Sequence, residues 1–147
     1  MRVSVIGGSE ITRSEYETAT TLGRELGSRG HDVVCGGLTG VMEGVAAGMA
    51  ETEGQVVGIL PGDDREDANP FVDVPIATGL GNARNVLVVL NGDAAIAIDG
   101  GTGTLSEIAH ALDLGRPVAG LDTHDIRGVE AVDSPREAIE YVERETA

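Results

Sequence analysis

Three glycine-rich segments stand out among the residues that can do chemistry in this sequence. Each follows a short apolar run and precedes a stretch with helical spacing. Glycine lets a backbone approach a ligand closely, and a helix N-terminus offers unpaired N–H groups and partial positive charge to an anion. These glycines are also compatible with simple turns between strands and helices. The segments are Gly7-Gly8-Ser9, Gly36-Gly37-Leu38-Thr39-Gly40 and Gly100-Gly101-Thr102-Gly103-Thr104.

The third segment carries the strongest signal, because its five residues are all Gly or Thr and supply hydroxyl groups as well as N–H groups. A cradle of this kind can hold phosphate without lysine, which this chain lacks. The predicted phosphate- or nucleotide-binding residues are Gly7, Gly8, Ser9, Gly36, Gly37, Gly100, Gly101, Thr102, Gly103 and Thr104.

Two charged residues lie near these segments. Glu107 follows Thr104 by three positions, so it can be the reciprocal half of a capping box, a carboxylate that serves the sugar of a nucleotide, or both. Arg84 precedes an apolar run and is either a phosphate clamp or a surface ion pair. If the protein is an enzyme, Arg84 and Glu107 are its predicted catalytic residues.

Several other sites find no support. The segments match neither the dinucleotide pattern G-x-G-x-x-G nor a P-loop ending in Gly-Lys, and no nucleophile elbow G-x-S-x-G occurs. His31, His110 and His124 lack the spacing of metal ligands. Cys35 is expected to be a small buried hydrophobic residue. No metal site is predicted.

The elements that position these residues alternate along the chain. Short β-rich runs separated by helical patterns predict βαβ units, a parallel sheet and one α/β domain over residues 1–147. The first helix is expected to begin with a capping box of Ser14 and Glu17, and the last begins after Ser134. Strands are expected at residues 2–6, 32–35, 55–60, 72–77, 94–98 and 118–121.

Two segments remain open on the pattern alone. Residues 86–90 and 94–98 flank Asn91-Gly92 and are compatible with a β-hairpin, yet residues 86–90 are equally compatible with a short buried helix. Residues 61–70 are polar and acidic, which predicts an exposed loop that is either simply solvated or a gate over the ligand.

Composition narrows the class of protein. The chain has 147 residues, 25 acidic and 10 basic, with a net charge of −15 and 2% aromatic residues. That charge repels phosphate backbones and anionic lipid, so neither nucleic acid nor a membrane is an expected partner. An acidic chain without lysine predicts a halophilic protein, because high salt screens the self-repulsion. With no signal peptide or spanning stretch in the sequence, a cytoplasmic protein is expected.

The segments together resemble a known family. Residues 99–107, Asp-Gly-Gly-Thr-Gly-Thr-Leu-Ser-Glu, are similar to the P-G-G-x-G-T-x-x-E signature of the Lonely Guy (LOG) superfamily, often labelled "possible lysine decarboxylase". Residues 36–43 resemble its second glycine motif and residues 7–9 its first. Within the superfamily, Arg84-Asn85 looks closest to the short branch that includes molybdenum cofactor carrier proteins.

The resemblance implies a fold and an assembly. It implies a Rossmann-like, doubly wound parallel sheet in three α/β/α layers, a helix after Arg84 and a homodimer or higher homo-oligomer. It therefore favours the helix over the hairpin at residues 86–90.

The resemblance also implies an activity. LOG enzymes cleave the N-glycosidic bond of nucleoside 5′-monophosphates with an Arg and a Glu, which match Arg84 and Glu107. Three positions depart from the enzymes: Asn85 replaces Lys, Asp99 replaces Pro and Leu38 replaces Gly. Asp99 places negative charge beside the expected phosphate. Lysine decarboxylation is excluded, because a chain without lysine has none to form the Schiff base with pyridoxal phosphate.

Two functions follow from these observations. The first is a binding or carrier protein for a nucleotide-like, phosphorylated small molecule, with a nucleotide or a molybdopterin-type compound as the ligand and no required cofactor. The second is a phosphoribohydrolase that splits a nucleoside 5′-monophosphate into base and ribose 5-phosphate.

Overall fold

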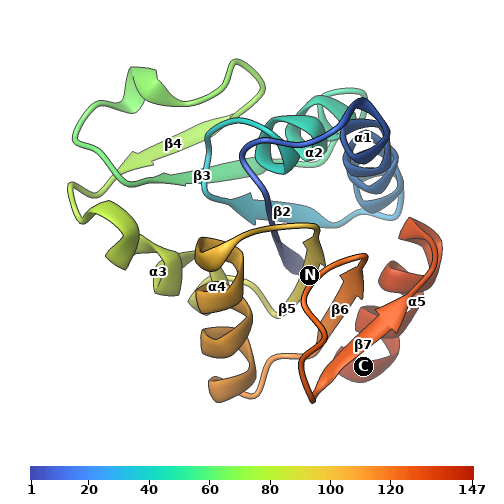
Figure 1. Cartoon of the computed structure of the whole chain (residues 1–147). Coiled ribbons are helices and arrows are strands. Elements are labelled where there is room, and N and C mark those ends of the chain that lie inside the picture. Colours follow the sequence, from blue (N-terminus) through green and yellow to red (C-terminus); the bar gives the residue numbers. More distant parts are fainter.

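The computed structural model describes residues 1–147 and contains one seven-stranded sheet in which every neighbouring pair of strands is parallel (Figure 1). The strands are β1 (Arg2–Gly7), β2 (Asp32–Cys35), β3 (Val56–Leu60), β4 (Val74–Ala77), β5 (Ala94–Ile98), β6 (Val118–Leu121) and β7 (Val129–Val132). The helices are α1 (Arg13–Ser28), α2 (Val41–Met49), α3 (Asn85–Leu90), α4 (Thr102–Asp113) and α5 (Pro135–Thr146), with short 3-10 turns η1 (Arg65–Asp67) and η2 (Gly81–Arg84). The predicted Rossmann-like fold is confirmed.

The strand order creates a switch point in the middle of the sheet. The order is β4-β3-β2-β1-β5-β6-β7, so the chain builds outward from β1 to β4, returns to β5 beside β1, and then builds the other way. The pairing of β1 with β5 runs from Val3 opposite Ala94 to Gly7 opposite Ile98. In sheets of this type, ligands bind outside the carboxyl ends of the strands where the direction of winding reverses.

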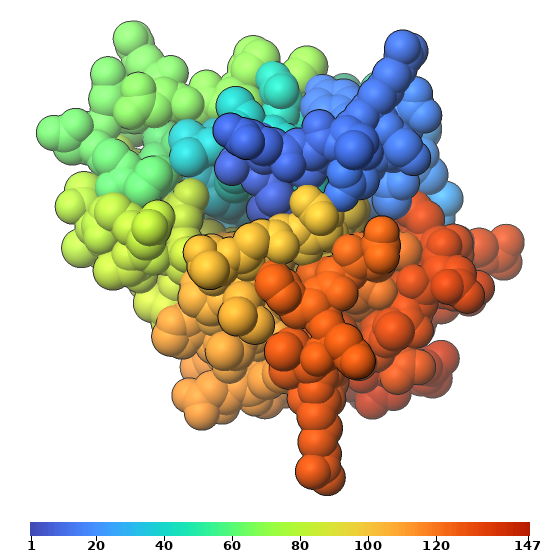
Figure 2. Space-filling view, viewed as in Figure 1, coloured from blue at the N-terminus to red at the C-terminus, as the bar shows by residue number.

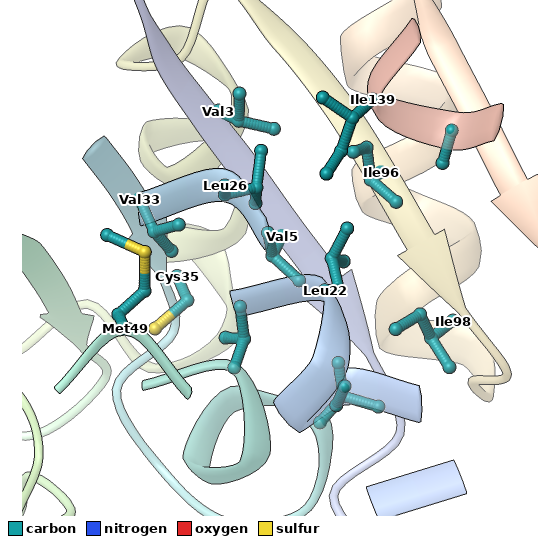
Figure 3. Packing of buried hydrophobic residues seen from close by; sticks show 14 of the residues in the cluster. Val3, Val5, Leu22, Leu26, Val33, Cys35, Met49, Ile96, Ile98 and Ile139 are labelled. Atoms are coloured by element: carbon teal, nitrogen blue, oxygen red, sulfur yellow. The ribbon is translucent and has the colours of Figure 1, made fainter. Parts of the chain in front are cut away.

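Two apolar layers cover the sheet. α1, α2 and α5 pack on one face around a core that includes Ile96 and Ile98, and Figure 3 shows this packing. α3 and α4 pack on the other face with Ala95 and Ala97. Successive residues of a strand point to opposite faces, so β5 is apolar at every position because both of its faces are covered.

The start of α1 corrects one prediction. The capping box consists of Thr12 and Glu15, not Ser14 and Glu17: the Thr12 hydroxyl accepts from the backbone N–H of Glu15, and the Glu15 carboxylate accepts from that of Thr12. The sequence contains two overlapping patterns of the same type. The earlier one fits because the helix begins at Arg13.

The segment before β5 is helical, as the family resemblance implied. α3 ends at Leu90 and the next residue, Asn91, has φ −90°, while Gly92 does not have the positive φ that a two-residue hairpin turn requires. The edge strand β7 was not predicted, and β4 begins at Val74 rather than at residue 72. None of the helices combines the length and apolar character needed to cross a bilayer.

Candidate ligand-binding site

A cleft of about 330 Å³ opens at the switch point between β1 and β5. In Figure 2 the blue residues that follow β1 lie against the gold residues around position 100, at this edge of the sheet. The cleft is lined by Val5, Ile6, Gly7, Gly8, Ser9, Gly36, Leu38, Met42, Asn82, Arg84, Asn85, Gly101, Thr102, Gly103, Thr104 and Glu107.

The first turn of α4 presents unpaired backbone donors on this cleft. Gly101 is the N-cap residue, and no side chain caps this end of the helix. The first backbone N–H of α4 that donates a hydrogen bond is that of Leu105, which donates to the Gly101 carbonyl. The N–H groups of Thr102, Gly103 and Thr104 therefore have no partner in the protein. Orphan N–H groups at a helix N-terminus bind anions.

The Arg84 side chain is held in place by three acceptors from three different parts of the fold. Its Nε donates to the Ile59 carbonyl at 2.8 Å, its Nη2 to the Gly36 carbonyl at 3.4 Å, and its Nη1 to the Asn85 Oδ1. A guanidinium has five N–H groups, so two remain for a ligand. Burial lowers the pKa of Arg84, and the negative charge of Glu107 opposes that change.

The Arg84 guanidinium lies close to the backbone of Gly36, in the space beside its Cα atom. A Cβ atom at position 36 would lie 2.7 Å from the Arg84 Nη2 and 2.6 Å from the Met42 Sδ. Both distances are shorter than a real Cβ contact, so a side chain at this position would require the Arg84 guanidinium or the Met42 thioether to shift.

The Glu107 carboxylate faces the cleft without a partner. The residue is 8% exposed, its oxygens accept no hydrogen bond from the protein, and no ion pair joins it to Arg84. Burial raises the pKa of Glu107 to about 7, while the positive charge of Arg84 acts in the opposite direction. A carboxyl group that titrates near neutrality is suited to accept or donate a proton.

The structure corrects the capping role considered for Glu107. α4 begins at Thr102, which places Glu107 in the second turn, and its carboxylate makes no bond to the backbone at the helix start. The acidic loop 61–70 is fastened to the segment after β2 rather than hanging over the site: the Asn69 amide donates to the Leu38 carbonyl at 2.8 Å, and the Asn69 N–H to the Gly37 carbonyl. No residue of this loop lines the cleft.

Most of the residues singled out in the sequence meet at this cleft, including both charged ones. Gly37 and Gly100 do not line it. Sequence reasoning did not select Asn82, Asn85, Leu38 or Met42. The asparagines flank Arg84 in the chain, which is a signal that they share its location, whereas Leu38 and Met42 lie within or just after the second glycine segment.

The chain is similar to known proteins in sequence and in fold. A family model described as the SLOG cluster4 family matches residues 1–147. The chain belongs to this family. It is 42% identical to an uncharacterized protein of Archaeoglobus fulgidus over 142 residues, and these residues make up 96% of this chain and 93% of that protein.

Two solved structures resemble this SLOG cluster4 protein over nearly their whole length. The molybdenum cofactor binding protein from the phototrophic bacterium Rippkaea orientalis is 34% identical, with a TM-score of 0.93 over 99% of this chain and 97% of that one. The molybdenum cofactor carrier protein of Chlamydomonas reinhardtii is 29% identical, with a TM-score of 0.86 over 97% and 96% of the two chains.

Plant enzymes are more distant relatives. A probable cytokinin riboside 5′-monophosphate phosphoribohydrolase of Oryza sativa is 33% identical over 116 residues, which are 76% of this chain and 51% of the enzyme. The chain thus spans about half the length of the plant phosphoribohydrolases that it matches.

Proposed function

We propose that the cleft binds a small molecule that carries a phosphate group, either a nucleotide or a molybdopterin-type compound held as cargo. The observation that carries this proposal is the set of unpaired N–H groups of Thr102, Gly103 and Thr104 in the same cleft as Arg84. The helix dipole and the guanidinium act on an anion together. The cleft of about 330 Å³ lies at the small end of ligand sites, which span about 300–1,000 Å³.

The relatives support the same class of ligand. The Rippkaea orientalis protein is described as binding the molybdenum cofactor, and the plant enzymes are named for a nucleoside monophosphate. Both ligands combine a ring system with a phosphate group. In this cleft the phosphate would lie at the first turn of α4, and the ring would lie beside the apolar side chains of Val5, Ile6, Leu38 and Met42.

Binding is tested by calorimetry and thermal shift in high salt with AMP, GMP, CMP, UMP and a molybdopterin compound, and by native mass spectrometry of protein purified from its own host. We expect a co-purified phosphorylated molecule and a thermal shift from at least one ligand. Arg84→Ala should remove the shift, whereas Arg24→Ala, which removes an exposed arginine paired with Glu51, should preserve it. No co-purified molecule and no shift with any ligand would overturn the proposal.

A second candidate function rests on Glu107. Its unpartnered carboxylate, with a pKa raised by burial to about 7, is more than phosphate binding requires. In a phosphoribohydrolase it would steady positive charge at C1′ or orient the attacking water. Water adds to C1′, the bond between C1′ and the base nitrogen breaks, and the proton of the water passes to the base.

Hydrolysis is tested by chromatographic detection of free base from each nucleoside 5′-monophosphate. If the ionised carboxylate is the active form, the rate should rise with pH through about 7, the pKa of Glu107. Glu107→Gln should abolish base release, and Glu51→Gln, at an exposed carboxylate, should leave it unchanged. Release of base no faster than in Arg84→Ala, for every nucleotide, would remove the enzyme function and leave binding.

Adaptation to salt and self-association are separate proposals. The net charge of −15 favours a stability that rises with salt concentration, because screening weakens the self-repulsion. Ile76, Leu80 and Leu90 are 43%, 54% and 46% exposed, and such apolar surface favours a homo-oligomer. Unfolding midpoints measured between low and molar salt test the adaptation to salt. The molar mass from light scattering tests the self-association. A flat salt dependence or a monomeric mass would contradict them.

A further inference from the structure

A chain of side-chain hydrogen bonds connects Arg84 to the phosphate-binding turn. Asn85, the first residue of α3, is 5% exposed and accepts from the Arg84 Nη1 through its Oδ1. Its Nδ2 donates to the Ser106 Oγ at 3.2 Å, and the Ser106 hydroxyl donates to the Gly103 carbonyl at 2.6 Å. Asn85 therefore connects the guanidinium to the first turn of α4. The Arg84 side chain makes no direct hydrogen bond to α4.

Asn85 is also the one side chain that holds the guanidinium. The other two acceptors are the backbone carbonyls of Ile59 and Gly36. Glu107 is the charged group that competes for Arg84, since it is buried, lines the same cleft and makes no ion pair with Arg84. A buried carboxylate without a partner attracts any cation that is free to move.

We propose that Asn85 is a positioning residue, which holds Arg84 toward the phosphate-binding turn and away from the Glu107 carboxylate. This inference rests on the proposed function, because it assumes that the turn receives an anion. In the resulting site, Arg84 keeps free N–H groups for the ligand and Glu107 keeps an unpaired carboxylate. If Arg84 and Glu107 formed an ion pair, the N–H groups of Arg84 would no longer be free for the ligand, and the Glu107 carboxylate would no longer be unpaired.

The amide is the side chain that suits this position. It accepts a hydrogen bond from a cation and donates one to a hydroxyl at the same time. A carboxylate of the same shape accepts from Arg84 but cannot donate to Ser106, and it brings a second negative charge beside Glu107. An ammonium or guanidinium group cannot accept from Arg84 at all.

The test compares two substitutions of Asn85 in the full-length protein without ligand, with the pKa of Glu107 followed by NMR of the side-chain carboxyl carbon. Asn85→Leu removes both hydrogen bonds, so Arg84 moves toward Glu107 and the pKa of Glu107 falls relative to the wild type. Asn85→Asp keeps the acceptor and adds a charge, so the pKa of Glu107 rises. A purely structural role for Asn85 does not predict opposite directions.

The charged surroundings of Glu107 make this measurement specific. Arg84 is the charged group whose field reaches its carboxyl, and the nearby Cys35 thiol is uncharged below pH 9 because burial raises its pKa to about 11. Asn91→Leu, at the exposed end of α3, is the matched control and should leave the titration of Glu107 unchanged.

Affinity supplies the second measurement. Asn85→Leu should weaken binding of AMP or inorganic phosphate about tenfold, the equivalent of one hydrogen bond to a charged group. Ser106→Ala removes the hydroxyl that accepts from Asn85 and donates to Gly103, but it leaves the bond between Asn85 and Arg84, so it should act in the same direction with a smaller effect. If Asn85→Leu does not fold, Ser106→Ala and Asn85→Asp decide the question.

The inference is overturned if the pKa of Glu107 is unchanged in Asn85→Leu and Ser106→Ala, or if it moves in the same direction in Asn85→Leu and Asn85→Asp. Because that titration needs no ligand, it judges Asn85 even if no nucleotide binds. Failure of the wild type to bind any phosphate compound would instead contradict the proposed function.

Discussion

Glu107 lies near the carboxyl ends of the strands and Glu143 near their amino ends. Their pKa values are shifted in opposite directions from the ordinary value. Glu143 accepts from the His31 Nε2 at 2.7 Å and from the Arg29 Nη1 at 3.0 Å, and the hydrogen bond from His31 is the main reason that its pKa is lowered. Glu107 accepts no hydrogen bond, and burial raises its pKa to about 7. The Glu143 carboxylate thus has two hydrogen-bond donors in the protein, whereas the Glu107 carboxylate has none.

The surroundings explain this difference. His31 precedes β2, and its Nδ1 lies 3.3 Å from the N-terminal ammonium of Met1, so the Glu143 cluster joins the amino end of the sheet to α5. Its charges hold structural elements together in partial contact with water. At the carboxyl end, Arg84 is bonded to backbone and amide acceptors rather than to Glu107. There the Glu107 carboxylate and two N–H groups of Arg84 have no partner in the protein, at a cost in stability of the kind that is common at functional sites.

The largest effect is expected from removing Arg84. Arg84→Leu should lower the free energy of unfolding by about 2–4 kcal/mol at pH 8, because it leaves buried acceptors unpaired and removes the positive charge near Glu107. Denaturant unfolding measures the change, with Arg24→Leu as a control that should lose much less. Equal losses in the two variants would show that Arg84 is no more integral to the fold than a surface arginine.

An opposite and smaller effect is expected from Glu107→Gln. The pKa of Glu107 in the folded protein, about 7, exceeds the ordinary value of 4.5, so ionisation opposes folding and stability is lost as the pH rises from 4.5 to about 7. Glu107→Gln should therefore raise the free energy of unfolding by about 1–3 kcal/mol at pH 8 and by less at pH 5. A gain that does not depend on pH would indicate that the carboxylate is not responsible.

The smallest effect is expected at the partnered carboxylate. Because the pKa of Glu143 is lowered from 4.5, its contribution is present above pH 4.5 and is lost as the pH falls below that value. Glu143→Gln should cost about 0.5 kcal/mol at pH 7, a small value because the pair is partly exposed and screened by solvent. Urea unfolding at pH 7 and pH 4, with Glu53→Gln as control, measures it. A larger loss at pH 4 than at pH 7 would reverse the sign of the comparison.

The sequence was informative about the centre of the sheet and less so about its edges. β5 was predicted correctly because a strand covered on both faces is apolar throughout. The edge strand β7 has exposed residues at Glu130 and Ala131 and shows no apolar run, so no local pattern indicates it. The segment Asn85–Leu90 could be assigned to a helix only by family resemblance, because a short apolar run fits either structure.

The location of the cleft was also predictable, because the carboxyl ends of parallel strands share one edge and the glycine segments follow three such strands. The roles of individual side chains within the cleft were not. Glu107 has capping spacing from Thr104, yet the helix begins before Thr104, so that spacing has no structural meaning. Asn85 forms its contacts with Ser106 across 21 positions, and no sequence pattern specifies such a bond.

The close approach of Gly36 and Arg84 limits which residues position 36 can accept during evolution. These residues are 48 positions apart, and the guanidinium occupies the space that a methyl group on Gly36 would need. In a lineage that acquires a side chain at position 36, the end of the Arg84 or the Met42 side chain has to shift to make room for it. A residue other than glycine at position 36 should therefore be accompanied by a different packing of Arg84 or Met42.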